Sequence, residues 1–397
     1  MTRRKKLIEV ALPLDLINRA AADEKAVPRR GHPQTLHYWW ARRPLAACRA
    51  VLFASLVDDP SSDPEQFPTE DAQDKERQRL FRILEALVKW ENSNNPTVLE
   101  AARGEIRKST RGNPPPVLDP FCGGGSIPLE AQRLGLRSDG SDLNPVAVLI
   151  TKALIEIPPQ FRNKPPVNPE SKKLLDHSKS WHDVTGLAAD VRYYGNWIQL
   201  NAVNRLEQYY PAVQNEGKPL AYQWARTVQC PNPACKFLIP LTTTLTLSIA
   251  KKWSAWLEPV LDVPNKKVSF EVKHGETKVR SGSMTRSGAS CMACGTAVSF
   301  DHLRSEAKAG KMGTQLLAVL VDKNGERYWV PHSEEQSVAA ASAVATDVPE
   351  TSLPEQALGF RVQAYGMLRH RDLFTSRQLL AMQVFSDSVI AVRAMVV

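Results

Sequence analysis

The sequence of 397 residues lacks the features that would assign it to a secreted or membrane class. Its basic start, Arg3–Lys6, is followed by Glu9 and Asp15 instead of the uninterrupted apolar segment of a signal peptide. No run approaches the ~20 apolar residues that a membrane helix requires. Its six cysteines therefore favour metal ligation or free thiols over disulfides. We expect a cytoplasmic protein without a membrane partner.

The overall composition is that of a soluble globular protein. Hydrophobic residues make up 43% of the chain and charged residues 23%. The length is enough for two or three domains. The net charge of +9 favours a polyanionic partner such as nucleic acid, although this observation alone is weak because many soluble proteins are basic.

The stretch Val117–Ala131 contains the most informative local pattern. Val117 and Leu118 are typical of the end of a buried strand, and three glycines, Gly123–Gly125, follow. A helix is predicted to begin near Ser126, which is a favourable N-cap residue. Strand, glycine loop and helix together allow backbone N–H groups to approach a ligand at a helix N-terminus.

Two known glycine-rich motifs are excluded here. No lysine follows the glycines, as a phosphate loop would require, and Asp119 and Phe121 occupy positions where a dinucleotide fingerprint has glycine. A carboxylate beside a glycine turn suits a cationic amino-acid ligand such as S-adenosylmethionine. A second acid, Asp142, follows the next predicted strand, residues 137–141, and is placed to accept ribose hydroxyls. The alternative is a strand–helix turn with incidental acids and no ligand.

The two motifs, Asp-Pro-Phe-Cys-Gly-Gly-Gly-Ser and Asp-Leu-Asn-Pro, resemble motifs I and II of amino-methylating DNA methyltransferases. More closely, the chain resembles the adenine-specific DNA methylases that contain a zinc ribbon and begin with a domain of unknown function. Residues 31–44, 186–197 and 365–375 and the cysteine pairs also support this resemblance. It implies that S-adenosylmethionine is bound by Asp119, Pro120, Phe121, Gly123, Gly124, Gly125, Asp142 and Asn144.

Two cysteine pairs predict a metal site. Cys230 and Cys235 are separated by four residues, and Cys291 and Cys294 by two, with a glycine directly after the second pair. Four thiolates suit one tetrahedral zinc ion and leave no position open for a substrate, so a structural role is expected. Alternating segments between the pairs, residues 242–249 and 268–272, are predicted strands. The alternative is four unrelated buried cysteines.

The resemblance and the local patterns together predict an α/β fold. We expect a partial Rossmann-like methyltransferase core, with an N-terminal helical region and an inserted β-rich zinc ribbon. The predicted segments are a helical domain (1–112), the first βα units (113–160), a helical linker region (161–225), the zinc-ribbon insertion (226–332), a flexible connector (333–358) and the start of a C-terminal methyltransferase part (359–397).

The cluster Trp39–Arg43 allows two interpretations. Its aromatic and basic side chains could stack on bases and neutralise phosphates, or the tryptophans could belong to the core with the arginines covering them. The resemblance also offers His32-Pro33 and Leu36 as a weakly matching element that would help to enclose a cofactor.

The motif that would grip the acceptor base is not found. Related enzymes flip the adenine out and bind it with an Asp/Asn/Ser-Pro-Pro-aromatic motif. Asn113–Pro116 lacks the aromatic residue, and Ile157–Gln160 lacks both the polar start and the aromatic residue. We therefore predict no catalytic residue in this chain. The last helix, predicted from Thr375, has no closing cap, so we expect the N-terminal portion of a larger methylase or half of a split enzyme.

The expected activity is S-adenosylmethionine-dependent adenine-N6 methylation of DNA, of a restriction-modification or phage-defence type, inactive in this chain alone. Cytosine C5 methylation is disfavoured because the sequence has no Pro-Cys dipeptide for the nucleophile. The alternatives are a non-catalytic zinc-ribbon subunit that binds nucleic acid and a methyltransferase acting on RNA or a small molecule. DNA and a completing second chain are the expected partners.

Overall fold

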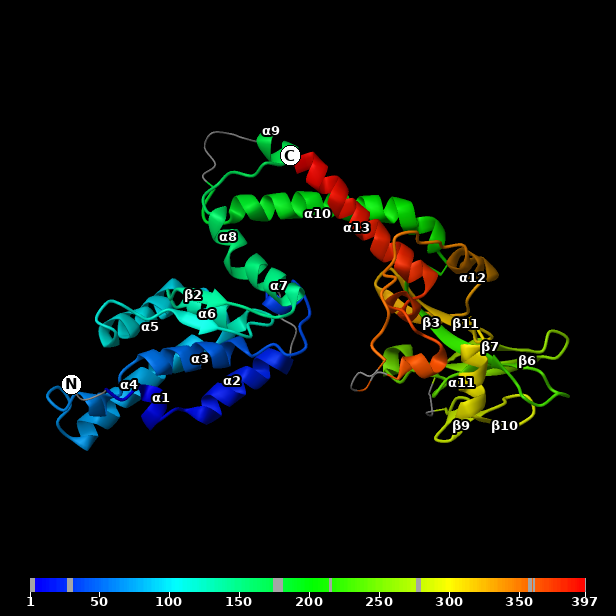
Figure 1. Cartoon of the computed structure of the whole chain (residues 1–397), viewed down its shortest axis with the longest axis horizontal. Helices are drawn as coiled ribbons and strands as arrows, with labels where there is room; N and C mark the ends of the chain where they lie inside the picture. Colours follow the sequence, from blue (N-terminus) through cyan, green and yellow to red (C-terminus); the bar gives the residue numbers. More distant parts are fainter. Residues whose placement is uncertain are drawn as a thin grey trace. The chain divides into compact units, whose positions relative to one another are not determined.

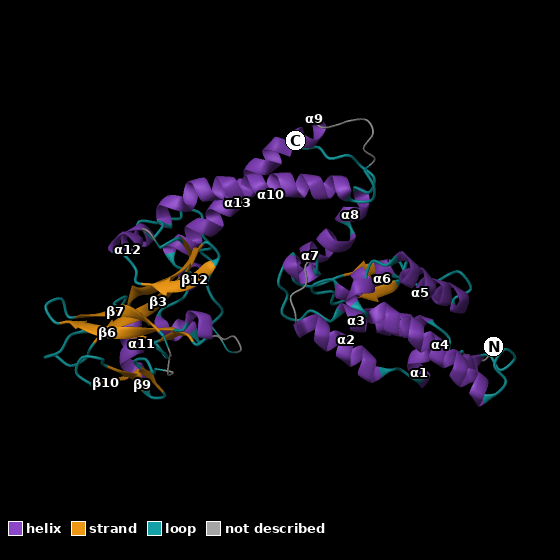
Figure 2. Cartoon of the chain, turned by 180° about the vertical axis from the view of Figure 1, so that it is seen from behind, coloured by secondary structure: helices purple, strands orange, loops and turns teal. Residues whose placement is uncertain are grey.

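The computed structural model describes residues 4–26, 31–173, 181–213, 216–275, 280–355, 359 and 361–396. Within them the chain is a mixed α/β protein, with many helices and one large sheet (Figures 1 and 2). It divides into two compact units, Met1–Val191 and Arg192–Val397, and helix α10 (Thr185–Leu206) contains the boundary between them. This division differs from the six predicted segments.

The first unit is mainly helical. Its elements are α1 (Leu7–Val10), α2 (Leu14–Ala26), η1 (Pro33–Thr35), α3 (Leu45–Leu56), η2 (Pro60–Ser62), α4 (Glu70–Val88), η3 (Trp90–Asn92), α5 (Pro96–Ser109), β1 (Val117–Asp119), α6 (Ser126–Arg133), β2 (Ser138–Gly140), α7 (Pro145–Ile155), α8 (Ile157–Gln160) and α9 (Pro169–Lys173).

One hydrophobic core joins the N-terminal helices to the strand–helix segment. Phe53 of α3, Leu84 of α4 and Ile106 of α5 are buried in it together with Ala131 of α6 and Leu134, the C-cap of that helix. The apolar residues of α4 recur at helical spacing, and they form its buried face. Residues assigned separately to 1–112 and 113–160 therefore bury their apolar side chains in a common interior.

Glu24 fixes the start of α3. Its two carboxylate oxygens accept the backbone amides of Leu45 and Ala46, each at 2.9 Å. His32, 3% exposed, lies 2.9 Å from the same carboxylate through Nε2, while its Nδ1 accepts the amide of Gln34. Because Nδ1 accepts, Nε2 carries the proton and donates to Glu24. Buried His32 thus supports the start of α3. This role differs from the cofactor-enclosing role that the resemblance suggested.

A buried ion pair connects α3 to α6. Arg49 and Glu130 both have fully buried side chains, and Arg49 Nε lies 3.0 Å from Glu130 Oε2. Arg49 Nη1 also donates to the carbonyl of Leu87 at 2.8 Å, and Arg133 pairs with the other oxygen of Glu130. An unpaired charge at this depth would be very costly, so the two side chains depend on each other.

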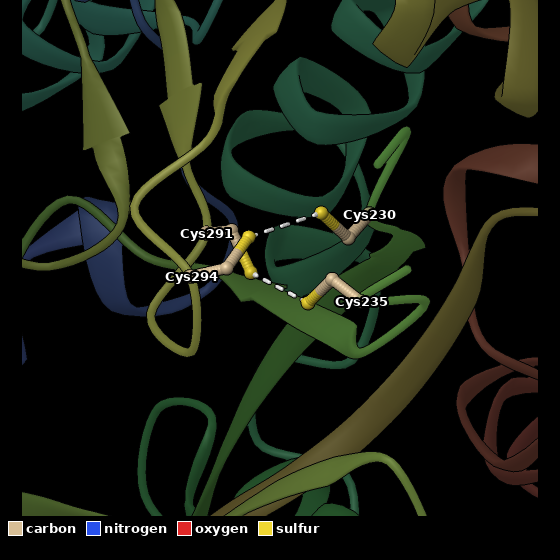
Figure 3. A group of neighbouring side chains, drawn as sticks. All are labelled: Cys230, Cys235, Cys291 and Cys294. Carbon is tan, nitrogen blue, oxygen red and sulfur yellow. Dashed lines mark hydrogen bonds between the residues drawn. The ribbon is translucent and has the colours of Figure 1, made fainter. Parts of the chain in front are cut away.

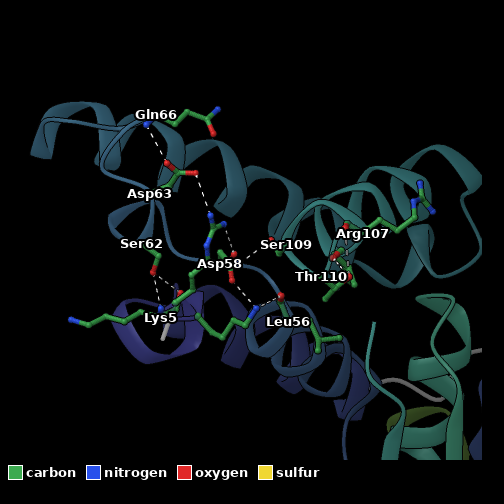
Figure 4. Close-up of polar contacts among 12 residues, drawn as sticks. Lys5, Leu56, Asp58, Ser62, Asp63, Gln66, Arg107, Ser109 and Thr110 are labelled. Carbon is green, nitrogen blue, oxygen red and sulfur yellow. Dashed lines mark hydrogen bonds and ion pairs between the residues drawn. The ribbon is translucent and has the colours of Figure 1, made fainter. Parts of the chain in front are cut away.

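Polar contacts hold the N-terminal segment against the end of α3 and the end of α5 (Figure 4). The ammonium of Lys6 donates to Asp58 Oδ1 at 2.7 Å and to the carbonyl of Leu56 at 3.0 Å. The amide of Asp58 in turn donates to Ser109 Oγ at 2.9 Å. The segment between α3 and α4 contains η2, and α4 begins at Glu70 behind the N-cap Thr69.

The two short strands form the predicted parallel pair. Val117, Leu118 and Asp119 of β1 are in register with Ser138, Asp139 and Gly140 of β2. α6 and α7 follow the strands as expected. The prediction of a buried strand end was wrong for Leu118, which is 70% exposed. The N-cap of α6 is Gly125 in the left-handed conformation (φ +74°) in place of the predicted Ser126.

The second unit is built on a seven-stranded sheet. Its elements are η4 (Glu207–Tyr209), β3 (Lys218–Gln229), β4 (Leu238–Leu241), β5 (Thr246–Ser248), η5 (Lys251–Trp253), β6 (Ala255–Asp262), β7 (Lys267–His274), β8 (Met284–Thr285), β9 (Gly288–Ser290), β10 (Ala297–Ser299), α11 (Phe300–Lys308), β11 (Gly313–Lys323), β12 (Glu326–Val330), α12 (Glu334–Ala341), η6 (Val362–Tyr365), η7 (His370–Leu373) and α13 (Ser376–Val396).

The order of strands in the large sheet is β12-β11-β3-β4-β7-β6-β5, and a smaller sheet has the order β10-β9-β8. All the pairs are antiparallel except β4 with β7, which meet in parallel at Leu238 and Lys267. The β-rich character predicted for residues 226–332 is confirmed. The sheet already begins at Lys218, and strand β5 is shorter than the predicted 242–249.

One segment differs from its predicted character. The connector 333–358 contains helix α12, whose start has a capping box in which Ser333 and Gln336 exchange hydrogen bonds. Residues 356–358 of the connector lie outside the described part of the chain. Helix α10, in the predicted helical linker region 161–225, packs part of its surface: Tyr194 and Leu206 are buried, whereas Val191 and Val203 are 65% and 51% exposed.

Helix α13 begins at the predicted capping box. Thr375 N donates to Gln378 Oε1 at 2.8 Å, and Gln378 N donates to Thr375 Oγ1 at 3.2 Å. The helix is long and apolar enough to cross a membrane by length and composition, a property that the search for uninterrupted apolar runs did not indicate. One such helix is weak evidence for a membrane segment, because helices of soluble proteins satisfy the same criterion.

Arg377 attaches the start of α13 to the sheet. Its guanidinium carbon lies 4.3 Å from the ring centre of Tyr210 and 4.2 Å from that of Tyr222. Nη1 donates to the carbonyl of Tyr209 at 2.9 Å. The side chain is nearly buried, so these cation–π contacts are largely desolvated and strong.

We expect Arg377→Ala to destabilise the second unit by about 2–3 kcal/mol, because it removes two desolvated cation–π contacts and a buried hydrogen bond. Arg393→Ala, at an exposed position of the same helix, is the matched control and should have little effect. Hydrogen exchange of the α13 and β3 amides measures the change. Equal protection in the two variants would contradict the prediction.

Candidate functional site

Four cysteines meet at one end of the second unit (Figure 3). Cys230 and Cys235 lie in the turn between β3 and β4, and Cys291 and Cys294 lie in the turn between β9 and β10. The sulfur atoms of Cys230 and Cys294 are 3.7 Å apart, and those of Cys235 and Cys291 are 3.8 Å apart. All four sulfur atoms lie within 4.8 Å of one another, so the structure brings together the predicted ligand set.

The spacing of the sulfur atoms fits a tetrahedral ion. A zinc–sulfur distance of about 2.3 Å places neighbouring sulfurs of a regular tetrahedron about 3.8 Å apart. Both short sulfur–sulfur distances match this value. The four thiols are free of disulfides. The group could therefore bind a metal such as zinc, with four protein ligands and no open position.

Backbone hydrogen bonds shape both cysteine turns. The amide of Cys230 donates to the carbonyl of Phe237 at 2.8 Å, and the amide of Cys291 donates to the carbonyl of Thr296 at 2.9 Å. Gly295 closes the second turn with φ +73°, a conformation that glycine adopts without strain. Burial raises the pKa of Cys230 to about 12, whereas hydrogen bonds from Thr296 lower the pKa of Cys294 to about 6.

The second candidate site surrounds the glycine loop of the first unit. Asp119 ends β1 and is buried, with Oδ1 accepting the amide of Phe121 at 3.2 Å. Asp142, two residues after β2, accepts the amide of Gly123 on Oδ2 at 2.9 Å and that of Asn144 on Oδ1 at 2.8 Å. The two predicted acids thus lie at the carboxyl end of the same parallel strand pair, and Asp142 contacts the loop directly.

The two acids have opposite pKa shifts. Burial raises the pKa of Asp119, and the nearby charge of Asp142 adds to this shift, while the amide of Phe121 opposes it. Hydrogen bonds from the amides of Asn144 and Gly123 lower the pKa of Asp142, so this group is ionised at neutral pH. A ligand cation beside Asp119 would lower the pKa of this carboxyl by electrostatic attraction and would favour its charged form.

The remaining predicted residues have distinct local roles. Gly123 and Gly125 have φ of +49° and +74°, so the loop needs glycine at both positions. Asn144 caps α7 by accepting the amide of Val146 at 2.9 Å. Pro120 is exposed, and Phe121 is 84% exposed beside the loop. Cys122 is buried against Gly140 and has a pKa raised mainly by burial, in agreement with a packing role.

Sequence reasoning did not foresee which residues cover the glycine loop. A Cβ atom placed on Gly123 would lie 2.8 Å from Trp39 Nε1, and one placed on Gly124 would lie 2.7 Å from Arg42 Nε. Both side chains belong to the Trp39–Arg43 cluster, for which base stacking and core packing were considered. The structure places this cluster on the loop: Trp39 is half-buried and stacks on Trp40, which is 73% exposed.

Comparison with known proteins gives one match. A family model described as a protein of unknown function, DUF1156, matches residues 11–83. This range includes α2, α3, the Trp39–Arg43 cluster and most of α4. No curated protein and no solved structure gives a significant match. The matched range covers less than a quarter of the chain and carries no statement of activity.

Proposed function

We propose that this chain supplies the cofactor-binding and zinc-ribbon parts of an S-adenosylmethionine-dependent DNA adenine-N6 methyltransferase. The observation that carries the proposal is the position of Asp119 and Asp142 at the ends of two paired parallel strands, on either side of a glycine loop that starts a helix. This is where βα sheets bind ligands. The sequence resemblance to zinc-ribbon methylases supports the choice of cofactor.

Each loop residue would have a defined role toward this cofactor. The carboxylate of Asp119 would bind the ammonium group, and the ionised Asp142 would accept the ribose hydroxyls. Gly123–Gly125 leave room for Trp39, Arg42 and Thr151, which lie against the loop. When bound, the cofactor supplies an electrophilic methyl group on its sulfonium.

The acceptor half of the reaction is proposed to lie outside this sequence, in the rest of a larger methylase or in a second chain. The Asp/Asn/Ser-Pro-Pro-aromatic motif of the resembling methylases does not occur in this sequence. Beside the loop, Leu118, Phe121 and Leu143 are 70%, 84% and 99% exposed. Exposed apolar side chains that lie together in this way are typical of a surface that another protein segment covers. The net charge of +9 favours DNA as the substrate, and the four-cysteine turns would brace a DNA-contacting surface.

We expect Asp119→Asn and Asp142→Asn each to weaken S-adenosylmethionine binding by about ten- to a hundredfold, because each removes a charged hydrogen-bond acceptor. Asp139→Asn is the matched control: it lies on β2 but is exposed and is paired with Arg137. Calorimetry on the full chain measures the affinities. Binding that is equally strong in all three variants would refute the proposed site.

A non-catalytic subunit that binds nucleic acid is the second candidate. It is favoured by the four-cysteine turns and the basic charge, which do not depend on a cofactor. Asp119→Ala separates the two functions. If the second candidate is right, the DNA affinity of Asp119→Ala equals that of the unaltered protein. In that case the unaltered protein also transfers no methyl group to adenine when a completing chain is supplied.

A further inference from the structure

The guanidinium of Arg42 lies directly against the backbone of the glycine loop. A Cβ atom on Gly124 would be 2.7 Å from Nε and 2.9 Å from Nη2 of this side chain. Gly124 has no positive φ, so backbone strain does not explain its presence. Glycine at this position is therefore needed for the space that Arg42 occupies.

Arg42 is poorly satisfied where it lies. In the part of the chain that the structure describes, its Nε and Nη1 are buried and have no hydrogen-bond acceptor. Nη2 donates to the carbonyl of His37 at a long distance of 3.4 Å. Burial lowers the pKa of Arg42, and Glu24 only partly offsets this effect. Because unsatisfied buried charged donors are costly, such a group calls for an acceptor that arrives from outside.

The turn that carries Arg42 holds it in place. The amide of Arg42 donates to the carbonyl of Trp39 at 3.3 Å, and the Trp39 indole lies over Gly123, the preceding loop position. Trp39 and Trp40 stack with ring centres 4.8 Å apart. The indole and the guanidinium therefore contact consecutive glycines of the same loop, and they come from one short segment.

The charges around the loop specify the kind of ligand. Asp119 and Asp142 favour a cation and hydroxyl groups, whereas the planar fork of an arginine matches a carboxylate or a phosphate. A ligand with an ammonium and a carboxylate on the same carbon atom satisfies both kinds of group. An amino-acid zwitterion has this arrangement, and a nucleic-acid phosphate does not.

We propose that Arg42 binds the α-carboxylate of an amino-acid-bearing cofactor, while Asp119 binds its ammonium. This inference rests on the proposed function, in which the cofactor is S-adenosylmethionine. It assigns a binding role to a residue within the matched range 11–83, for which no role is described. Trp39 is a positioning residue in this arrangement, since it sets the turn from which Arg42 extends.

The test uses the full chain and two ligands, S-adenosylmethionine and its decarboxylated analogue, which keeps the sulfonium, the amine and the ribose. Arg42→Gln is expected to weaken binding of S-adenosylmethionine by about ten- to a hundredfold and binding of the analogue by less than about threefold. Arg43→Gln, at the exposed neighbouring position, is the matched control and should change neither affinity.

A second variant moves the guanidinium without removing it. Gly124→Ala places a methyl group against Arg42, whose flexible side chain can shift, so the fold should persist. We expect this variant also to lose most of the preference for S-adenosylmethionine over the analogue. Gly104→Ala, at a helical position with open space around it, should retain the preference. Thermal unfolding checks that each variant is folded.

Each outcome has a definite meaning. Equal losses for the two ligands would overturn the proposal, because Arg42 would then act on a shared part of the cofactor or on the fold. Unchanged cofactor binding with weakened DNA binding would also overturn it and would make Arg42 a phosphate contact. No binding of either ligand to the unaltered protein would remove the proposed function and this inference together.

Discussion

Removal of the metal is expected to unfold the four-cysteine end of the second unit. The apparent free energy of zinc binding to structural sites is about 10–16 kcal/mol, as large as the whole stability of a typical domain, about 5–15 kcal/mol. The turn that carries Cys291 and Cys294 has little support from its own sheet, because the sheet β10-β9-β8 is short and its strands contain only two or three residues. The metal would therefore decide whether this region folds.

The direct measurement is metal content together with hydrogen exchange. The purified chain should contain about one zinc per molecule, and Cys291→Ser should lose it together with the protection of the β9 and β10 amides. Cys48→Ala is the matched control, since Cys48 is a buried thiol in α3 of the other unit. It should retain the zinc and the protection of the cysteine turns.

The opposite outcome is equally clear. Retention of the metal by Cys291→Ser would show that Cys291 is not a required ligand. If the purified chain contained no zinc, and chelation left the exchange of the β9 and β10 amides unchanged, the four cysteines would be packing residues. Burial alone would then hold Val228, Ile239 and Leu303 together in the surrounding core. The match between the sulfur–sulfur distances and a tetrahedral ion would in that case have no functional meaning.

Loss of one partner of the Arg49–Glu130 pair should have the second largest effect. Glu130→Ala leaves Arg49 charged and fully buried, which is expected to destabilise the first unit by about 3–5 kcal/mol. The double variant Arg49→Leu with Glu130→Leu removes both charges and should be considerably more stable than the single variant. Glu85→Gln, in an exposed pair with Lys89, should cost no more than about 1 kcal/mol.

Urea unfolding of the first unit, followed through exchange of the α3 and α6 amides, measures these differences. If the single variant were as stable as the unaltered protein, acceptors other than Glu130 would be sufficient for Arg49. One such acceptor is the carbonyl of Leu87, to which Arg49 already donates. A double variant as unstable as the single one would show that the pair stabilises the fold beyond the mutual compensation of its charges.

Local sequence patterns predicted several elements around the glycine loop and elsewhere in the chain. The glycines, the start of α7 at Pro145 and the capping box at Thr375 are short-range signals, and the structure contains all three. The cysteine pairs were also predicted to meet although they are distant in sequence, because tetrahedral thiolate ligation requires it. In these cases the chemistry of a few residue types limits the possible arrangements.

Long-range packing could not be predicted in the same way. Periodicity along a helix does not show that Arg49 of α3 and Glu130 of α6 meet. Nor could it place Trp39 and Arg42 on a loop more than eighty positions later. The apolar character of Leu118 suggested burial, yet a strand can be apolar and still have an uncovered side.

The shared core of the first unit limits how the segment matched as DUF1156 can be transferred from one protein to another. Its helices α2, α3 and α4 bury their side chains against α5 and α6, which lie beyond residue 83. A fragment ending at residue 83 would expose the apolar side chains that α6 covers and would leave Arg49 without Glu130. The segment is therefore not a portable module, and recombination that separates it from its glycine loop should yield chains that aggregate.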